Sequence, residues 1–335
     1  MFSFFVIFPG RPRQKTEHQT TNHQPTEPTI LKQQILDIEN LSKSYGKLEA
    51  LKELDLSVER GQVFGLLGPN GSGKTTTLGI ILGALHPNRG DFRWFGERLT
   101  EKSLKRIGAI LEHPNFYPYL NAVDNLKIVA RIRNSDVSDI DRVLRLTNLY
   151  DRRLHRYQTY SYGMKQRLAI AGSLLGNPEV LILDEPTNGL DPLGIAEIRE
   201  LIAGVAAEGT TIIMASHLLD EVQKICSHVA VLKQGRKLFA GSVDDVLNNT
   251  ETILVGAESM EALEAALIEY PDYQSHKISS GFVEMKSNGV VRPAEINHFL
   301  FEKGIVCTHL SIRKKSLENY FLEITASNGG TNQAS

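Results

Sequence analysis

The chain reads Gly68-Pro69-Asn70-Gly71-Ser72-Gly73-Lys74-Thr75 between an apolar run at 63–67 and helically spaced apolar residues at 75–85. This octapeptide fits the pattern G-x-x-x-x-G-K-[ST] of a phosphate-binding loop, and its flanks predict the strand and helix that such a loop joins. Backbone N–H groups and the positive end of the helix dipole would then converge on one anion. A solvated surface turn is the alternative, and the flanking strand and helix disfavour it.

The residue types of this loop indicate its ligand. Glycines at 68, 71 and 73 let the backbone approach oxygens that a Cβ would block. Lys74 is expected to meet the β- and γ-phosphates of a nucleotide, and the Thr75 hydroxyl to ligate Mg²⁺. The loop therefore predicts ATP and Mg²⁺ as ligands, held by Gly68, Pro69, Asn70, Gly71, Ser72, Gly73, Lys74, Thr75 and Thr76.

Composition excludes several classes of protein. With 41% hydrophobic and 23% charged residues, the 335-residue chain has the make-up of a soluble globular protein of one large or two medium domains. A net charge of −2 gives no reason to expect nucleic acid as a partner. The two cysteines, Cys226 and Cys307, lie outside any CxxC pattern, which argues for a reducing compartment. No apolar run approaches the length of a membrane span.

The N-terminal segment 1–33 is predicted to be a disordered extension. Residues 1–9 are apolar but too few for a span, and no basic residue precedes them as in a secretory signal. Residues 11–29 are rich in Thr, Gln, His and Pro, which favours disorder. A short anchor or a partner-binding tag is the alternative.

The middle of the chain alternates between strand and helix patterns. Continuous apolar runs, typical of parallel strands covered on both faces, lie at 180–183, 210–214 and 228–232. Helical patterns lie at 163–175, 194–207 and 218–225. This alternation predicts an α/β fold built on a parallel sheet.

Two further segments belong to the same predicted domain, which spans 34–247. An antiparallel sheet is expected from patterns at 35–38, 54–58 and 91–95. Residues about 103–160 are mostly helical, with one helix starting at Asn121 and Asp124 and another over 137–146. The last helix is predicted to begin with Ser242 as its N-cap.

A smaller α+β domain is predicted for 248–326, followed by a disordered tail at 327–335. Strand patterns lie at 251–255, 282–285 and 305–310. Helical patterns lie at 260–268, 293–301 and 317–324. No catalytic set of residues stands out in this part.

Asp184-Glu185 directly follows the buried strand 180–183. A carboxylate at the end of a parallel strand, beside a phosphate loop, can hold Mg²⁺, and the next carboxylate can polarise an attacking water. Alone, the pair would be read as a solvated loop start. With the phosphate loop upstream, we expect Asp184 to be a metal ligand and Glu185 a catalytic residue.

A third motif, Tyr160-Ser161-Tyr162-Gly163-Met164, lies one helix ahead of the Asp184 strand. A serine hydroxyl at a helix start suits a γ-phosphate, although an ordinary capped helix would also explain Ser161. With the preceding motifs, this segment resembles the signature of ATP-binding-cassette (ABC) transporter subunits, where Leu-Ser-Gly-Gly-Gln is usual. Ser161 and Gly163 are kept, and the resemblance covers about residues 35–324.

Three further positions resemble motifs of this family. Gly189-Leu190-Asp191-Pro192 resembles the D-loop, through which two subunits communicate. His217 resembles the switch histidine that contacts the γ-phosphate, a role that a hydrogen-bonding imidazole can fill. Tyr45 takes the place of the aromatic residue that stacks on adenine, and a turn tyrosine packed on the core is the alternative.

The resemblance implies a fold and a composite site. The fold would be a P-loop NTPase of the ABC type, with a RecA-like parallel core, an antiparallel β subdomain and a helical subdomain. MgATP would be held by Lys74, Thr75, Asp184, Glu185 and His217 of one subunit. A second cassette, expected to be a copy of this chain, would cover the γ-phosphate with its Ser161 and Gly163.

Glu112 departs from the usual family pattern, because a glutamine is common after the strand 107–111. The run Glu112-His113-Pro114-Asn115-Phe116-Tyr117-Pro118 resembles exporters of bacitracin-like and lantibiotic peptides. A carboxylate binds Mg²⁺ more strongly than an amide does, so Glu112 is a candidate metal ligand. Contact with a basic residue of a membrane partner is the alternative.

The resemblance implies an ATPase that drives export through a separate integral membrane permease. The subunit would lie on the cytoplasmic face of the membrane, and the helical segment at 103–160 would dock on the permease. A peptide antibiotic or a drug is the leading cargo. The alternatives are a lipid- or polysaccharide-export complex, a motility-linked complex, and a non-transport cassette that acts on ribosomes or DNA.

Overall fold

The computed structural model describes residues 33–112, 115–248, 252–279, 281–287, 292–313 and 316–327. They fall into two compact units, here called the N-terminal unit, which ends at Ala240, and the C-terminal unit, which begins at Gly241. The division precedes the predicted domain boundary at 247/248. Apart from Gln33 and Ser327, the predicted disordered segments 1–33 and 327–335 lie outside the described residues.

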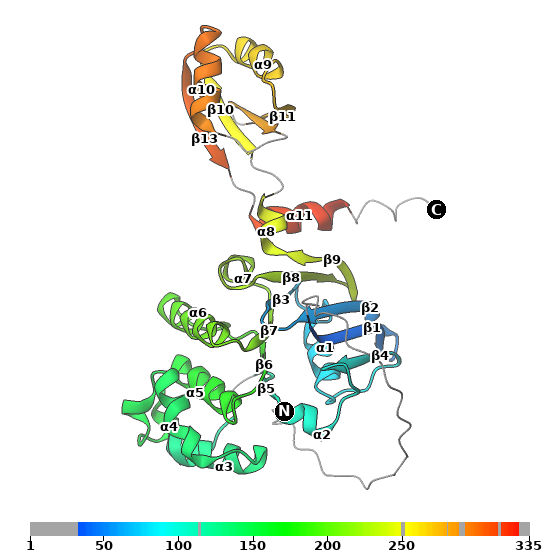
Figure 1. Ribbon diagram of the computed structural model, residues 1–335, viewed down its shortest axis with the longest axis vertical. Helices are drawn as coiled ribbons and strands as arrows, with labels where there is room; N and C mark the ends of the chain where they lie inside the picture. Colours follow the sequence, from blue (N-terminus) through cyan, green and yellow to red (C-terminus); the bar gives the residue numbers. More distant parts are fainter. Residues whose placement is uncertain are drawn as a thin grey trace, which may run out of the picture. The chain divides into compact units, whose positions relative to one another are not determined.

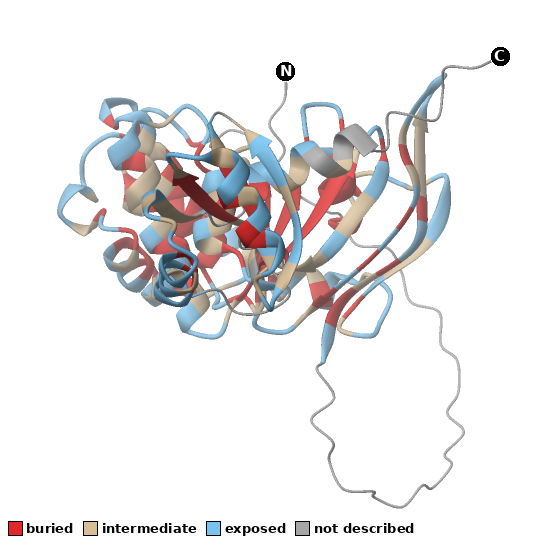
Figure 2. Cartoon of the chain, turned by 90° about the horizontal axis from the view of Figure 1, so that it is seen from above, coloured by how far each residue is buried: buried red, intermediate tan, exposed pale blue. Residues whose placement is uncertain are grey.

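A six-stranded sheet forms the centre of the N-terminal unit, with strand order β5-β6-β7-β3-β8-β9 (Figure 1). Its strands are β3 (Val63–Leu67), β5 (Ile107–Ile110), β6 (Val180–Asp184), β7 (Thr211–Ser216), β8 (His228–Lys233) and β9 (Arg236–Ser242). Pairing is parallel between β5, β6, β7, β3 and β8. Every residue of β3, β6 and β7 is buried, which confirms the predicted α/β core with its parallel sheet (Figure 2).

Helices α1 (Lys74–Ile81), α6 (Pro192–Ala207) and α7 (Leu219–Ile225) pack around this sheet, with α1 on one side and α6 and α7 on the other (Figure 1). The start of α6 is fixed by sequence: the Asp191 side chain accepts a hydrogen bond from Gly194 N at 2.9 Å, and Pro192 is the first helical residue. The turn that leads into α6 is thereby held in one conformation.

A separate antiparallel sheet has the order β2-β1-β4, with β1 (Gln34–Tyr45), β2 (Leu48–Glu59) and β4 (Arg89–Trp94). Its strands are longer than predicted, and Tyr45 is the last residue of β1 rather than part of a turn. Register shifts interrupt the β1–β2 pairing, and Asn40 and Glu53 have positive φ angles. These bulges break the alternation of polar and apolar residues, so the pattern stopped short of the real strand ends.

The segment 103–160 contributes β5, which matches the strand expected at 107–111, to the central sheet, and helices and turns follow it. Its helices are α2 (Glu101–Lys105), α3 (Ala122–Arg133) and α4 (Ile140–Leu146). Short 3₁₀ turns lie between α3 and α4 and between α4 and α5 (Tyr162–Leu174). The predicted cap of α3 is confirmed, because the Asn121 side chain accepts a hydrogen bond from Asp124 N at 2.9 Å. The predicted helix over 137–146 begins as a 3₁₀ turn at Val137–Asp139.

The C-terminal unit is an α+β fold with its own core. Its antiparallel sheet has the order β11-β12-β10-β13, and the core includes Ile253, Val255, Leu263, Met285 and Leu300. The strands are β10 (Thr252–Ala257), β11 (Tyr273–Ser279), β12 (Phe282–Ser287) and β13 (Cys307–Arg313). The helices are α8 (Val243–Asn248), α9 (Met260–Ile268), α10 (Pro293–Glu302) and α11 (Leu317–Ser327).

Two details of this unit bear on the predictions. Ser242 Oγ accepts a hydrogen bond from Asp245 N at 3.3 Å, which confirms the predicted cap of α8. β11 was not predicted, because its sequence is polar and it lies at a sheet edge. Within the described residues of both units, no helix has the length and apolar character that crossing a membrane requires.

Candidate active site

The phosphate loop joins β3 to α1 in a conformation that only glycine tolerates at two positions. Gly68 has φ 152°, and a Cβ there would lie 2.3 Å from the Leu232 carbonyl oxygen. Gly73 has φ 108°, and a Cβ there would lie 2.6 Å from Leu51 Cδ2. Because both Cβ positions are filled, the loop lies tightly against β2 and β8 and its backbone has one shape.

Lys74 extends back across this loop and is almost fully buried. Its Nζ donates a hydrogen bond to the Gly68 carbonyl oxygen at 2.8 Å and lies 3.3 Å from Glu185 Oε1. The side chain is only 6% exposed, so its charge needs these partners. The ammonium group is therefore held over the loop, where a phosphate would lie.

Thr75 and Asp184 bring two oxygen ligands together. Thr75 Oγ1 donates to Asp184 Oδ2 at 2.9 Å, while the buried Asp184 Oδ1 has no hydrogen-bond partner among the described residues. Burial raises the pKa of Asp184, the Thr75 hydrogen bond opposes this rise, and the charge of Glu185 adds to it. An oxygen that is buried and unpaired is a group that a cation would satisfy, so the residues present fit Mg²⁺.

The described residues contain no group of three or more His, Cys, Asp or Glu side chains that could hold a metal by themselves. A cation beside Asp184 would therefore take its remaining ligands from Thr75, water and phosphate oxygens. This is the coordination that Mg²⁺ adopts in nucleotide sites.

Glu185 and His217 form a hydrogen-bonded pair next to Lys74. Glu185 Oε2 lies 2.8 Å from His217 Nδ1, and the carboxylate is about four-fifths buried. The Glu185 backbone has a positive φ of 49°, and its N–H donates to the Ala215 carbonyl oxygen at 3.0 Å. This backbone strain turns the side chain away from the strand direction and toward Lys74 and His217.

Sheet order explains why these motifs meet. In the central sheet β7 lies between β6 and β3, and all three strands run parallel. The phosphate loop follows β3, Asp184 ends β6 with Glu185 next to it, and His217 follows β7. Parallel strands end at the same edge, which is where ligands bind in sheets of this kind.

Glu112 lies on an exposed turn after β5 and has a positive φ of 61°. Its negative charge contributes to the raised pKa of Asp184, although less than burial does. In the described part of the chain, no hydrogen bond joins Glu112 to Asp184. The following residues, His113 and Pro114, lie outside it.

The other predicted nucleotide contacts lie apart from this cluster or at its edge. Tyr45 is 47% exposed, and the Lys43 ammonium lies 5.3 Å from its ring centroid. Ser161 is the exposed N-cap of α5 and accepts a hydrogen bond from Met164 N at 3.2 Å. In the part of the chain that the structure describes, no hydrogen bond joins Ser161 or Gly163 to the phosphate loop.

The remaining loop residues differ in exposure. Pro69 and Asn70 are exposed, Thr76 is half-buried, and Ser72 is buried with an unpaired hydroxyl oxygen. Sequence reasoning missed Gly235, whose N–H donates to the Ser72 carbonyl oxygen at 3.1 Å and supports the loop from the β8–β9 turn. The Gln234-Gly235 pair is a turn signal that could have indicated it.

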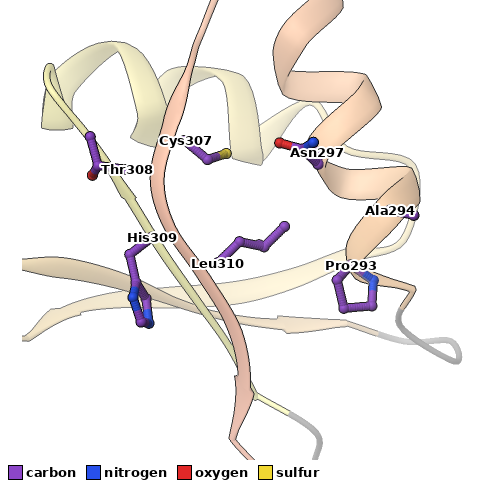
Figure 3. A pocket seen from close by; sticks show the side chains of 7 residues that line it. All are labelled: Pro293, Ala294, Asn297, Cys307, Thr308, His309 and Leu310. Atoms are coloured by element: carbon purple, nitrogen blue, oxygen red, sulfur yellow. The ribbon is translucent and has the colours of Figure 1, made fainter.

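A shallow pocket of about 370 Å³ lies in the C-terminal unit, between α10 and β13 (Figure 3). In Figure 3 the Asn297 and Cys307 side chains point into it. It is lined by Pro293, Ala294, Asn297, Cys307, Thr308, His309 and Leu310. None of these is Asp, Glu, Lys or Arg, so the pocket lacks the charges of the site in the N-terminal unit.

Comparison with known proteins agrees with this geometry. The family profile named ABC transporter matches residues 51–188. The bacitracin transport ATP-binding protein BcrA of Bacillus licheniformis is 36% identical, over 89% of this chain and 98% of that protein. The chain belongs to the ATP-binding subunits of ABC transporters.

Two further ABC proteins extend the comparison. The lantibiotic transport ATP-binding protein SrtF of Streptococcus pyogenes is 39% identical over 64% of this chain and 96% of that protein. A dimeric ATP-binding cassette, solved in a post-hydrolysis state with ADP and phosphate, is 25% identical and has a TM-score of 0.55. It covers 62% of this chain and 99% of that cassette. The ABC ATPase fold predicted from the motifs is confirmed.

Proposed function

We propose that this ABC subunit hydrolyses ATP and thereby drives export of a peptide antibiotic or a drug through a separate membrane permease. The observation that carries the hydrolytic part is the cluster formed by Lys74, Asp184 and Glu185. The Lys74 ammonium is buried, one buried oxygen of Asp184 has no hydrogen-bond partner among the described residues, and the Glu185 backbone is strained. The export part rests on the named functions of the bacitracin and lantibiotic relatives.

Each residue of the cluster has one role in this proposal. The loop N–H groups and Lys74 bind the β- and γ-phosphates, and the Thr75 hydroxyl and Asp184 hold Mg²⁺. When bound, Mg²⁺ neutralises phosphate charge. Glu185 accepts a proton from the attacking water, and His217, at 2.8 Å from it, orients the carboxylate and donates a hydrogen bond to the γ-phosphate. Tyr45 stacks on the adenine from the edge of β1.

A second cassette completes the site. Ser161 and Gly163 lie at the exposed start of α5, without a hydrogen bond to the phosphate loop of their own chain in the described residues. In the proposal they cover the γ-phosphate bound by another copy, where the helix N-terminus favours an anion. ATP then joins two chains, and its hydrolysis separates them.

The permease is the second proposed partner. The helical segment 103–160 docks on it at the cytoplasmic face of the membrane, with Glu112 at the hinge before the first helix that follows β5. In the same proposal Glu112 either adds a carboxylate to the Mg²⁺ site or meets a basic permease residue. The near-neutral charge of the chain argues against nucleic acid as a partner.

Glu185→Gln tests the hydrolytic role. The amide keeps the shape of the side chain but cannot accept the proton, so turnover is expected to fall about a hundredfold or more. ATP binding remains, and an ATP-bound dimer accumulates, which size-exclusion chromatography with light scattering detects. Wild-type turnover in this variant would remove Glu185 from the role of general base.

Affinity purification from detergent-solubilised membranes of the cell that produces the chain tests the transport role. We expect one or two integral membrane proteins to co-elute in fixed stoichiometry. Co-elution with ribosomes or DNA instead, and no membrane protein, would contradict the permease.

A further inference from the structure

Tyr162, the first residue of α5, lies against the loop that follows Glu185. A Cβ built on Gly189 would lie 3.4 Å from Tyr162 Cε1 and 4.0 Å from its hydroxyl oxygen. One residue further along, a Cβ on Gly163 would lie 3.7 Å from Leu190 Cδ2. The start of α5 therefore packs on residues 189–190, although 27 residues separate Tyr162 from Gly189 in the sequence.

Gly189 is linked to Glu185 by two consecutive turns. Asn188 N–H donates to the Glu185 carbonyl oxygen at 3.1 Å, and Leu190 N–H donates to the Thr187 carbonyl oxygen at 3.3 Å. The loop then ends at the capped start of α6. Because both ends are fixed and the turns are tight, a displacement of Gly189 would shift the backbone that carries the Glu185 side chain.

A packed group of aromatic side chains lies near Tyr162. Tyr157 is 6% exposed, and its ring meets that of Phe116 edge-on, with centroids 5.4 Å apart. Burial raises the pKa of Tyr157 to about 12, and the neighbouring Tyr162 adds to this rise. Tyr162 therefore lies near this packed aromatic group and touches Gly189, while it is itself 39% exposed.

We infer that Tyr162 is a positioning residue whose ring holds the 186–191 loop, and through it Glu185, in the geometry needed for hydrolysis. This inference rests on the proposed function. Tyr162 stands between Ser161 and Gly163, which in the proposed dimer contact the nucleotide of the other chain. Contact there would press the ring onto Gly189, so that closure over one nucleotide positions the glutamate of the opposite site.

Tyr162→Ala and Tyr162→Phe test this role in the full-length chain. Phe keeps the ring and is expected to retain kcat within about twofold. Ala removes the contact with Gly189 and is expected to lower kcat about tenfold. The Kd for MgATP should stay within about twofold in both, because the phosphate loop is untouched. Phe301→Ala, which truncates an aromatic residue that is 70% exposed in the C-terminal unit, is the matched control with unchanged kinetics.

The Glu185→Gln background distinguishes a positioning role of Tyr162 from general damage to the fold. Combined with Glu185→Gln, Tyr162→Ala should still form the ATP-bound dimer, because the inference assigns Tyr162 to hydrolysis and not to nucleotide bridging. Loss of that dimer, or a kcat for Tyr162→Ala equal to that of the wild type, would overturn the inference while leaving the hydrolytic function in place. If the wild-type chain neither hydrolyses ATP nor dimerises, the proposed function itself fails.

Discussion

The two units treat buried polar groups differently. In the described residues, the buried side-chain atoms without a hydrogen-bond partner are Ser72 Oγ, Arg167 Nε and Asp184 Oδ1, all in the N-terminal unit. In the C-terminal unit the buried Glu284 is paired with Lys277 at 2.8 Å and with Arg313 at 3.0 Å. Two of the three unpaired atoms lie in the phosphate loop and beside it, where a bound ligand would supply the missing partner.

Non-glycine residues with positive φ angles are also distributed unequally between the two units. All non-glycine residues with positive φ in the described chain belong to the N-terminal unit, and they include Glu112 and Glu185. Such conformations cost free energy and persist where the surrounding structure enforces them, often at functional sites. The comparison teaches that the N-terminal unit leaves polar atoms unpaired and the Glu185 backbone strained at its candidate site, whereas the C-terminal unit pairs its buried Glu284 internally.

Lys74→Ala, in the N-terminal unit, should have the largest effect of the substitutions considered. It removes the buried ammonium held over the phosphate loop, which in the proposal binds the phosphates, so affinity for MgATP should fall roughly a hundredfold. Isothermal titration calorimetry measures this loss, and Lys105→Ala, an exposed lysine of α2, is the matched control. Equal ATP affinity in Lys74→Ala and the wild type would refute the loop assignment.

Glu179→Gln tests a carboxylate of the N-terminal unit that is paired with two arginines. Glu179 Oε2 accepts hydrogen bonds from Arg60 Nη2 at 2.7 Å and from Arg106 Nη2 at 3.0 Å. Because water screens these partly exposed charges, we expect the free energy of unfolding to fall by about 1–2 kcal/mol at pH 7. Urea unfolding measures it, with the exposed Glu101→Gln as control.

The pH dependence of the free energy of unfolding is a second test of the same ion pairs. The hydrogen bonds and charge of Arg106 lower the pKa of Glu179 from 4.5 to about 2. A lowered carboxyl pKa gives stability that is complete above pH 4.5 and is lost as the pH falls toward 2. The stability difference between the wild type and Glu179→Gln should therefore shrink in this range; a difference that stays constant would contradict the ion pair.

Glu284→Gln should have a smaller effect, confined to the C-terminal unit. Lys277 and Arg313 are 70% and 55% exposed, so both remain solvated when the charge of Glu284 is removed. The expected cost is about 1 kcal/mol, visible by thermal unfolding, without a change in ATP affinity. Glu302→Gln, on the surface of α10, is the control. An altered ATP affinity in Glu284→Gln would show that the two units are not separate in function.

Glu112→Gln should have the smallest effect. If Glu112 supports the Mg²⁺ site, the amide raises the Mg²⁺ concentration for half-maximal hydrolysis by about threefold, and hydrolysis itself continues. Glu53→Gln is the matched control, because Glu53 is also an exposed glutamate with positive φ. An unchanged Mg²⁺ titration would count against contact between Glu112 and the metal.

The sequence indicates motifs and caps best where the signal is local. The loop from Gly68 to Thr75, the Asp184-Glu185 pair and the cap at Asn121 each lie within a few residues, and local hydrogen bonding and backbone geometry suffice to recognise them. Parallel strands were also readable, because burial on both faces makes them continuously apolar.

Features that depend on distant partners could not be predicted. Arg60 and Glu179 are 119 residues apart, so their ion pair is visible only in the fold. The polar strand β11 is paired at one edge of a sheet and lacks an apolar run. The unpaired oxygen of Asp184 and the contact of Tyr162 with Gly189 depend on how separate elements pack, which no periodicity records.

The central claim is that two copies of this chain form one hydrolytic assembly around ATP. The most direct test measures the specific ATPase activity of the purified chain against its own concentration, with Mg²⁺ present. We predict that activity per chain rises with protein concentration and reaches a plateau, since in the proposed assembly each site takes Ser161 and Gly163 from a second copy. Activity per chain that is independent of concentration in a chain that stays monomeric, or no hydrolysis at any concentration, would contradict the account.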